Sequence, residues 1–142
     1  MYIKILTLLA SILLPLSASA QSEILGKWLT DEKDAHIEIT KSGDEYIGKI
    51  VWLEEPKNED GSPKTDLNNP DEDLQSRPIL NMTMLSGFNY SRGQYRGGNI
   101  YDARSGNTYK SKMWLEDDDN TLMMRGYWGM FYKTVALTRV VE

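Results

Sequence analysis

The stretch from Gly97 to Gly129 constrains the fold most strongly, because two turn sequences divide it into segments in which apolar and polar residues alternate. The first turn spans Asp102–Asn107, where the Asp102 side chain can accept hydrogen bonds from backbone N–H groups ahead of it and Gly106 can adopt a positive φ. The second is the acidic run Glu116–Asn120. Alternation with a period of two residues is typical of a half-buried β-strand. The stretch therefore predicts two consecutive β-hairpins.

The same alternation extends through most of the chain after residue 20, and no segment there keeps a helical period of 3.6 residues over three turns. The predicted strands are residues 26–30, 35–41, 46–53, 79–85, 95–101, 108–115, 121–128 and 132–141. Gly48, inside the third, predicts a bend or bulge. Closure is the best way for such a chain to remove its unpaired strand edges. The predicted fold class is therefore all-β, an antiparallel up-and-down barrel of about eight strands, whose interior is either filled by side chains or holds one small ligand.

Residues 54–78 interrupt the alternating pattern. The segment holds four prolines, Gly61 and eight acidic residues. No core can be built from this composition, so we predict a long acidic loop between two strands. Loops of this length in a small domain are often functional. Within it, Asp66 and Asn69-Pro70 are expected to fix the loop by hydrogen bonds between side chains and backbone.

The first 20 residues have the pattern of a secretory signal peptide. Lys4 supplies a positive charge, residues 5–16 form an apolar run, and Ala18-Ser19-Ala20 matches an A-x-A cleavage site. The run is shorter than the roughly 20 apolar residues of a membrane-spanning helix. The predicted organisation is a signal peptide at 1–20 and a single barrel domain at 21–142, with no transmembrane span after signal removal. The predicted localisation is periplasmic or secreted.

Composition argues against several classes of function. The chain has no cysteine, so its stability must come from a packed core. Without Lys4, 15 basic residues face 21 acidic ones, a net charge of −6, and the basic residues are scattered singly, which disfavours a nucleic-acid partner. His36-x-Glu38 lacks the Cys-x-x-Cys of a deaminase-type zinc site. No Gly-x-Ser-x-Gly occurs, and the oxygen donors of the long loop do not follow EF-hand spacing. We therefore assign no catalytic residue, no metal and no cofactor.

Two resemblances support an envelope barrel. Gly26-Lys27-Trp28 and Arg139 resemble the pairing in lipocalin-like barrels, where a guanidinium over an indole ring closes the barrel floor. The chain also resembles the small secreted bacterial proteins of domain-of-unknown-function family 2147, which implies an envelope β-barrel without an established activity. The matching motifs are Gly26-x-Trp28, Asp66-x-x-Asn69-Pro70, Leu85-x-Gly87-Phe88, Gly98-x-Ile100-Tyr101-Asp102-x-x-Ser105-Gly106-x-Thr108-Tyr109, Leu122-x-x-Arg125-Gly126-Tyr127-x-Gly129 and Arg139. Structural roles are expected for Gly26, Trp28, Asp66, Asn69, Pro70, Gly98, Gly106, Gly126, Gly129 and Arg139.

A group of aromatic and polar residues around the two hairpins forms the candidate site. Pairing across the Asp102–Asn107 turn is expected to bring Tyr101, Asp102 and Tyr109 together at one barrel end, with Arg125 on a neighbouring strand as a partner for Asp102. Together with Trp128, these residues are assigned to the mouth of a ligand pocket or, alternatively, to a closed polar network. Six methionines in the surrounding strands supply adaptable packing: Met82, Met84, Met113, Met123, Met124 and Met130.

Three hypotheses for the function follow from these patterns. The first is a secreted lipocalin-like barrel that binds a small apolar or amphipathic molecule. The second is a solid-cored module that binds another envelope protein through the acidic loop. The third is an enzyme of unknown reaction that uses Asp102 and Arg125. A hollow interior favours the first hypothesis over the second.

Overall fold

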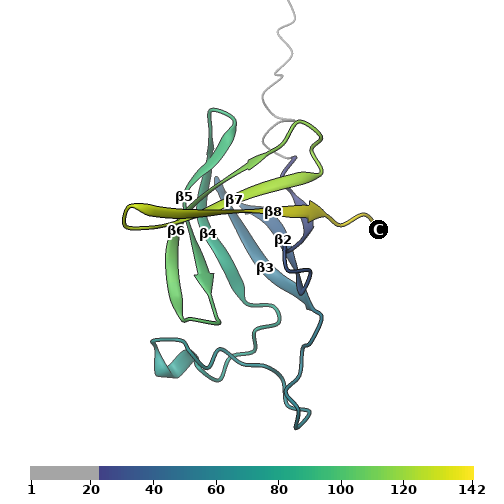
Figure 1. Ribbon diagram of the computed structural model, residues 1–142, viewed down its shortest axis with the longest axis vertical. Coiled ribbons are helices and arrows are strands. Elements are labelled where there is room, and N and C mark those ends of the chain that lie inside the picture. The colour runs from purple at the N-terminus through teal and green to yellow at the C-terminus, as the bar shows by residue number, and fades with distance from the viewer. Residues whose placement is uncertain (1–22) are drawn as a thin grey trace, which may run out of the picture.

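The computed structural model describes residues 23–142 as a closed antiparallel barrel of eight strands in sequence order (Figure 1). The predicted fold class is confirmed. The predicted signal peptide lies outside the described residues. The strands are β1 (Gly26–Leu29), β2 (Ala35–Ser42), β3 (Glu45–Leu53), β4 (Thr83–Ser91), β5 (Gln94–Asp102), β6 (Asn107–Leu115), β7 (Thr121–Trp128) and β8 (Phe131–Arg139). No helix among residues 23–142 is long and apolar enough to cross a membrane.

The fourth strand differs from the prediction. β4 begins at Thr83 and continues through Gly87 to Ser91, whereas residues 79–85 were expected. Gly87 adopts φ +77, a conformation that usually marks a break, but the pairing register of β4 with β5 is the same on both sides of it. The glycine therefore lies within a continuous strand. The segment before Thr83 belongs instead to the long loop.

Two glycines allow strands and rings to approach closely across the barrel wall. The register of β3 with β4 shifts on both sides of Gly48, which confirms the predicted irregularity. A Cβ atom at Gly48 would lie 2.8 Å from Leu85 Cδ1, and one at Gly98 would lie 2.4 Å from the Phe88 ring. A side chain at either position would displace a fully buried neighbour. The close packing of Leu85 and Phe88 on these strands thus depends on the absence of side chains at Gly48 and Gly98.

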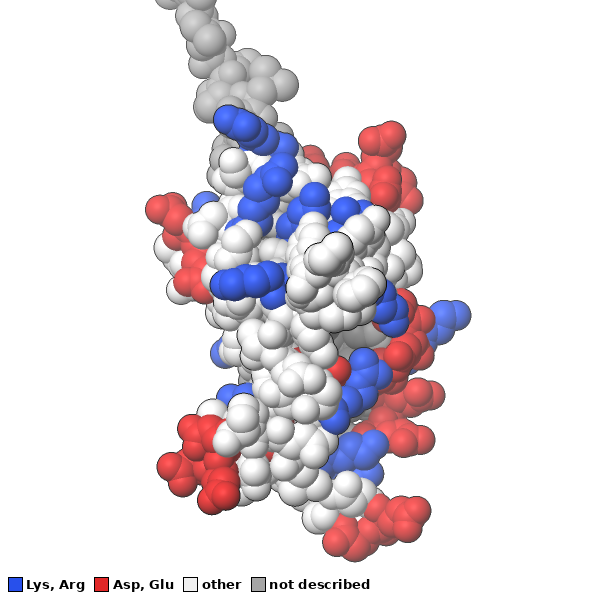
Figure 2. All heavy atoms as spheres, turned by 60° about the vertical axis from the view of Figure 1, so that its left-hand side comes forward, with Lys and Arg blue, Asp and Glu red and all other residues white. Residues whose placement is uncertain are grey.

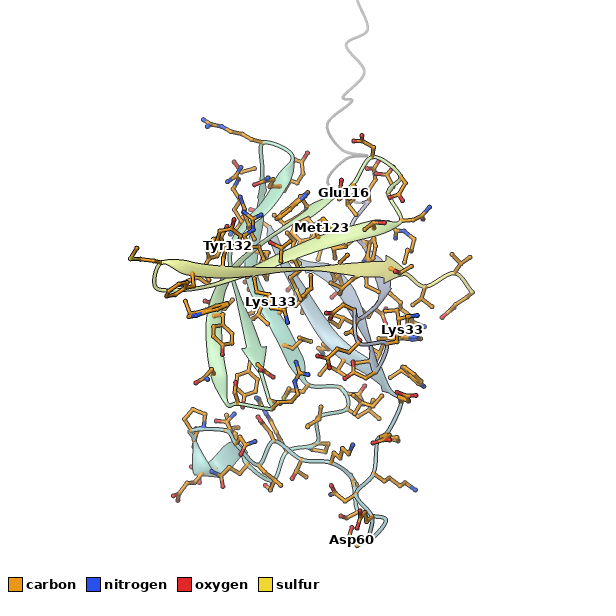
Figure 3. The ribbon with its side chains drawn as sticks, viewed as in Figure 1. Lys33, Asp60, Glu116, Met123, Tyr132 and Lys133 are labelled. Atoms are coloured by element: carbon orange, nitrogen blue, oxygen red, sulfur yellow. The ribbon has the colours of Figure 1, made fainter. Side chains whose placement is uncertain are left out.

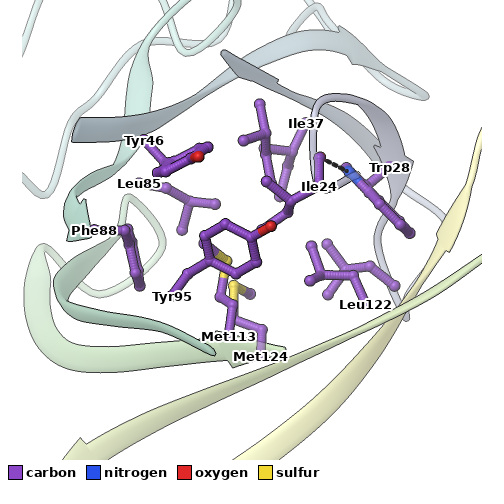
Figure 4. Close-up of a cluster of buried hydrophobic side chains, with 12 residues drawn as sticks. Ile24, Trp28, Ile37, Tyr46, Leu85, Phe88, Tyr95, Met113, Leu122 and Met124 are labelled. Atoms are coloured by element: carbon purple, nitrogen blue, oxygen red, sulfur yellow. Dashed lines mark hydrogen bonds between the residues drawn. The ribbon is translucent and has the colours of Figure 1, made fainter. Parts of the chain in front are cut away.

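One half of the barrel is filled by large side chains (Figure 4). Trp28 is fully buried there, and its indole Nε1 donates a hydrogen bond to the Ile24 carbonyl at 2.9 Å. Burial of such a side chain stabilises the fold by about 2–3 kcal/mol. The other members of this core are Ile24, Ile37, Ile39, Tyr46, Leu85, Phe88, Tyr95, Met113, Leu122, Met124 and Leu137.

Arg139 closes the filled end from outside. Its guanidinium lies over the Trp28 ring, 4.3 Å from the centroid, which is the stacking that the lipocalin resemblance implied. The same group donates hydrogen bonds to the carbonyls of Leu25 at 3.1 Å and Asp119 at 2.9 Å. It therefore joins the start of the barrel, the β6–β7 turn and the last strand. We call this end the floor.

The barrel is closed by a short seam next to the floor. β1 pairs with β8 at two register positions, Trp28 with Arg139 and Leu29 with Thr138. β7, by contrast, pairs with β8 along its whole length, from Thr121 to Trp128. Residues 131–137 of β8 therefore have no strand partner on their β1 side. The barrel opens along this side as it leaves the floor.

The opposite end carries the long loop between β3 and β4. It contains one short 3-10 helix, η1 (Glu72–Leu74), and two isolated bridges, Lys57 with Pro63 and Thr65 with Pro78. Figure 1 shows the loop extending beyond the ends of β3, β4, β5 and β6. We call this end the mouth, and its geometry decides whether the interior is accessible.

Candidate binding site at the barrel mouth

A cavity of about 940 Å³ occupies the half of the barrel next to the mouth. Its size lies within the range of roughly 300–1,000 Å³ that is usual for small-molecule sites. The interior is therefore filled at the floor and hollow at the mouth. The apolar part of the lining comes from several strands and from the end of the long loop: Ala35, Ile37, Ile50, Leu53, Ile79, Met82, Met84, Ile100, Ala103, Met124, Val135 and Leu137.

A buried carboxylate anchors the long loop to the barrel wall. Asp66 is fully buried and accepts hydrogen bonds from the Tyr101 hydroxyl at 2.6 Å, Asn69 Nδ2 at 2.8 Å and Arg77 Nε at 2.9 Å. Arg77 also forms an ion pair with Asp66 at 2.9 Å and lies over the Tyr101 ring. Asp66 thus holds the loop mainly through side-chain partners, whereas side-chain-to-backbone bonds were expected. The expected type of bond occurs at Asn69, whose Oδ1 accepts from the Asp71 N–H at 2.8 Å.

Two pKa shifts follow from this arrangement. Burial alone would raise the pKa of Asp66, but the hydrogen bonds from Tyr101, Asn69 and Arg77 outweigh it, and the pKa lies below its usual value. Burial and the hydrogen bond to Asp66 raise the pKa of Tyr101 to about 12. At neutral pH the site therefore contains a charged carboxylate and a neutral phenol. Both are fully engaged in holding the loop.

The β5–β6 turn forms the adjacent part of the rim. Asp102 Oδ1 accepts from the Arg104 backbone N–H at 3.0 Å, and Asp102 Oδ2 accepts from the Ser105 hydroxyl at 3.2 Å. The Arg104 side chain donates to Glu32 at 2.8 Å, which ties this turn to the β1–β2 turn. Asn68 of the long loop donates from Nδ2 to the Arg104 carbonyl at 2.8 Å. Three separate segments therefore meet at the rim.

The structure places four of the five predicted site residues on the cavity lining: Tyr101, Asp102, Tyr109 and Trp128. The expected pairing of Asp102 with Arg125 is wrong. Met124 and Gly126 face the interior, so Arg125 between them must face out. Its guanidinium lies between two rings, 5.1 Å from the ring centroid of Trp114 and 4.3 Å from that of Tyr132. Arg125 Nε also donates a hydrogen bond to Thr134 Oγ1 at 2.7 Å.

Lys133 is a lining residue that was not predicted. It alternates in phase with Val135 and Leu137 on β8, so the same periodicity that assigned those two residues inward was sufficient to find it. Figure 3 shows Lys133 and Tyr132 on opposite sides of the β8 ribbon. Lys64 and Arg104, the other basic residues of the lining, have carboxylate partners. The Lys133 side chain has no hydrogen bond or ion pair among residues 23–142.

The six methionines divide among three environments. Met82 and Met84 line the cavity, Met113 belongs to the filled core, and Met124 belongs to that core and also lines the cavity. Met123 faces out on β7, and Met130 lies at the β7–β8 turn, almost fully exposed. Flexible thioethers in the wall suit an interior that adapts to ligand shape.

The side chains of the lining are suited to recognising a ligand by its shape and charge. Apolar side chains cover the depth of the cavity, and charged groups are restricted to the rim and to Lys133. Among residues 23–142, no group of three His, Asp or Glu side chains is placed to hold a metal ion. His36 lies outside the cavity, with its ring 4.5 Å from that of Trp52. The arrangement can enclose an apolar group and present one cation to a polar one.

Comparison with known proteins supports the fold and the family. The protein HP1028 of the human pathogen Helicobacter pylori, described as belonging to the lipocalin family, has a similar structure with a TM-score of 0.71. The two chains are 23% identical, and the similarity covers 84% of each, which establishes a shared fold. No curated protein matches the chain. The family model for uncharacterized proteins conserved in bacteria (DUF2147) matches residues 26–139. The chain therefore belongs to the DUF2147 family.

Proposed function

We propose that this protein binds a small amphipathic molecule in its barrel cavity, with the apolar part of the ligand inside and an anionic head group at Lys133. The observation that carries the proposal is the cavity of about 940 Å³ between the floor and the mouth, with its apolar depth and open rim. Each methylene group transferred from water into such a lining contributes about 0.8 kcal/mol. A hydrocarbon segment therefore supplies most of the affinity.

Lys133 supports the anionic head group. It is the basic lining residue without a carboxylate partner among the described residues, whereas Arg104 is paired with Glu32 and Asp102. Lys133 is the next inward-facing residue after Val135 toward the mouth, so it lies at the boundary between the apolar lining and solvent. A carboxylate or phosphate at this point gains a charge-assisted hydrogen bond while its tail lies in the cavity.

The cell envelope is the proposed location. It rests on the signal-peptide pattern of residues 1–20 and on the family membership, whose resemblance implied an envelope barrel. Fractionation of cells that express the chain with a C-terminal tag tests it. Release of a form that begins at Gln21 with the envelope fraction supports the proposal, and an intact cytoplasmic chain refutes it.

Fluorescence titration with cis-parinaric acid tests the ligand class. Val135→Trp fills the cavity and is expected to abolish binding, whereas Ala136→Trp places the same bulk on the exposed face of the same strand and should leave binding unchanged. Lys133→Gln should weaken binding of the acid without affecting the corresponding alcohol. Loss of one charge-assisted contact corresponds to roughly tenfold.

Three results would refute this proposal. The cavity is not the site if Val135→Trp and Ala136→Trp bind the acid equally well. If a long-chain amine binds as tightly as the acid, the rim carboxylates and not Lys133 set the head-group preference. If the wild-type chain binds none of the acid, alcohol and amine probes, the small-molecule function itself is wrong.

The two other hypotheses lose support from particular observations. A solid-cored interaction module requires a filled barrel, and the mouth half is hollow. The enzyme hypothesis used Asp102 and Arg125 together, and these residues lie on opposite faces of the wall. Neither hypothesis therefore provides a second candidate function of equal strength.

A further inference from the structure

The β7–β8 turn carries a cluster of exposed large apolar side chains. Met130 is 96% exposed, Phe131 68%, Tyr132 59% and Trp128 48%. Globular proteins usually expose such side chains singly, so a contiguous group signals an interaction site. We call these four residues the hairpin tip.

The tip is held rigidly by its own strands. β7 and β8 pair in register up to Trp128 and Phe131, which leaves a two-residue turn, Gly129-Met130. The rings of Trp128 and Phe131 are stacked, with centroids 6.4 Å apart. Because the backbone fixes this presentation, little conformational entropy is lost when the tip contacts a partner.

The strands beside the tip are strongly basic. β5, β6, β7 and β8 contain six basic residues and one acidic residue, Asp102, in a chain of net charge −5. Three of the basic residues, Lys110, Lys112 and Arg125, face out on adjacent strands, and β6 and β7 pair Lys112 directly with Arg125. Basic residues that are scattered along the sequence are therefore gathered on one face. Figure 2 shows Lys and Arg side chains around a white projection, with acidic residues at the edges of the view and at its lower end.

We propose that the hairpin tip inserts into the interfacial region of an anionic lipid bilayer, with Lys110, Lys112 and Arg125 contacting the lipid head groups. Trp and Tyr favour the boundary between hydrocarbon and water, because their rings are apolar and their N–H and O–H groups need polar partners. Lys and Arg near the surface are attracted to anionic lipids. The hairpin tip supplies the first property, and the outward faces of the adjoining β6 and β7 supply the second.

Shape and charge favour a bilayer over a protein or a nucleic acid. A stable protein–protein interface needs roughly 1,000 Å² of complementary surface, and four side chains on a projecting turn offer a convex anchor instead. A nucleic-acid site places bases on aromatic rings within a basic groove. Here the apolar side chains lie at the end of the hairpin and the basic side chains lie behind them. A bilayer surface has the matching order, with hydrocarbon beneath the charged head groups.

The hairpin tip adjoins the mouth of the cavity. Trp128 belongs to the tip and also lines the cavity, and Lys133 is one residue from Tyr132. Docking would therefore place the mouth at the bilayer surface, where an amphipathic molecule is released or taken up. This inference goes beyond ligand binding. Apart from Trp128, its residues do not line the cavity, so variants at Met130, Phe131, Lys110 and Lys112 let each proposal fail alone.

Vesicle co-sedimentation tests the docking. The wild-type protein should bind vesicles of phosphatidylglycerol and phosphatidylethanolamine, and bind vesicles of phosphatidylcholine much more weakly. Met130→Glu/Phe131→Glu should weaken binding by roughly 30-fold or more, since two apolar contacts are lost. The matched control Leu67→Glu/Val141→Glu makes the same change at two residues that are similarly exposed elsewhere.

A second pair of variants tests the charges. Lys110→Gln/Lys112→Gln should weaken binding by about fivefold for each lysine removed, whereas Lys33→Gln/Lys57→Gln should not. The same four variants are titrated with cis-parinaric acid, and unchanged affinity separates docking from ligand binding. The proposal is overturned if the wild type does not bind anionic vesicles, if control and tip variants lose binding equally, or if the face binds single-stranded DNA or one envelope protein in preference to vesicles.

Discussion

Gly106 gives the sharpest prediction, because an alanine there has no room. A Cβ atom at Gly106 would lie 1.9 Å from the backbone oxygen of Asn68, whereas ordinary contact begins at 3.4 Å. The long loop would have to retreat by about 1.5 Å. That movement breaks the hydrogen bond of 2.8 Å from Asn68 Nδ2 to the Arg104 carbonyl. We expect Gly106→Ala to detach the loop from the β5–β6 turn.

The magnitude follows from separate contributions. Alanine at the left-handed φ of +74 costs about 1 kcal/mol, and the lost hydrogen bond costs about another 1 kcal/mol. Displacement of the loop from its packed position raises the total to about 3 kcal/mol. Gly61→Ala is the matched control, because Gly61 has φ +84 in the same loop with no atom within 4 Å of its Cβ position. It should cost only about 1 kcal/mol.

Urea denaturation and hydrogen exchange measured by mass spectrometry provide the assay. Denaturation gives the free energy of unfolding for each variant, and exchange locates the change. In Gly106→Ala the amides of Asp66 and Ile79, which bond to Arg77 and Lys64 within the loop, should exchange faster while those of β7 and β8 stay protected. Equal effects of the two alanine substitutions would refute the close approach of loop and turn. Faster exchange throughout the barrel would show that the loop is not a separate unit.

Three further predictions address the loop anchor, the floor and the wall. The pKa of Asp66 is lower in the folded state, so its charge contributes stability that is present above its unfolded pKa of about 4 and is lost as the pH falls through the folded value. Asp66→Asn should therefore reduce the loss of unfolding free energy at acidic pH. An unchanged loss in urea denaturation at a series of pH values would contradict the role of Asp66 as the charged anchor. Arg139→Met should cost about 2–4 kcal/mol in urea denaturation, since it removes the ring contact with Trp28 and donors to two carbonyls, and Arg139→Lys should recover less than half of the loss. Gly98→Ala should destabilise the barrel by about 2–4 kcal/mol, because its Cβ would meet the Phe88 ring, and Gly98→Ala/Phe88→Leu should recover part of this loss in a thermal melt.

The sequence predicts the barrel well because alternation and closure are both local consequences of strand geometry. Inward positions such as Trp28, Ile37 and Leu122 alternate with outward ones, and turn residues separate the strands. The misplaced fourth strand shows the limit of this reasoning. The predicted strand ends at residue 85, but pairing with β5 on both sides of Gly87 carries β4 on to Ser91. Tertiary hydrogen bonding decides the role of such a glycine.

The candidate site was predicted only in part, for a different reason. Alternation along the strands is sufficient to turn Tyr109, Trp128 and Lys133 toward the cavity and Arg125 away from it. Whether the interior is filled could not be predicted, because an inward-facing residue gives the same pattern in either case. The floor is filled since Trp28, Tyr46 and Tyr95 are large and meet there (Figure 4).

The seam between β1 and β8 determines when the barrel can be completed. Its partners come from the two ends of the domain, and Arg139 bonds to a carbonyl 114 residues earlier in the chain. Contacts of such sequence separation form slowly, because the whole intervening chain must be ordered first. The hairpins from β2 to β8 can assemble as each is synthesised, but the Trp28–Arg139 contact requires the last strand. A chain truncated before β8 would leave β1 and β7 with unpaired edges, which are the sites at which copies of a sheet join one another. We therefore expect the addition of β8 to lower the tendency of this protein to aggregate.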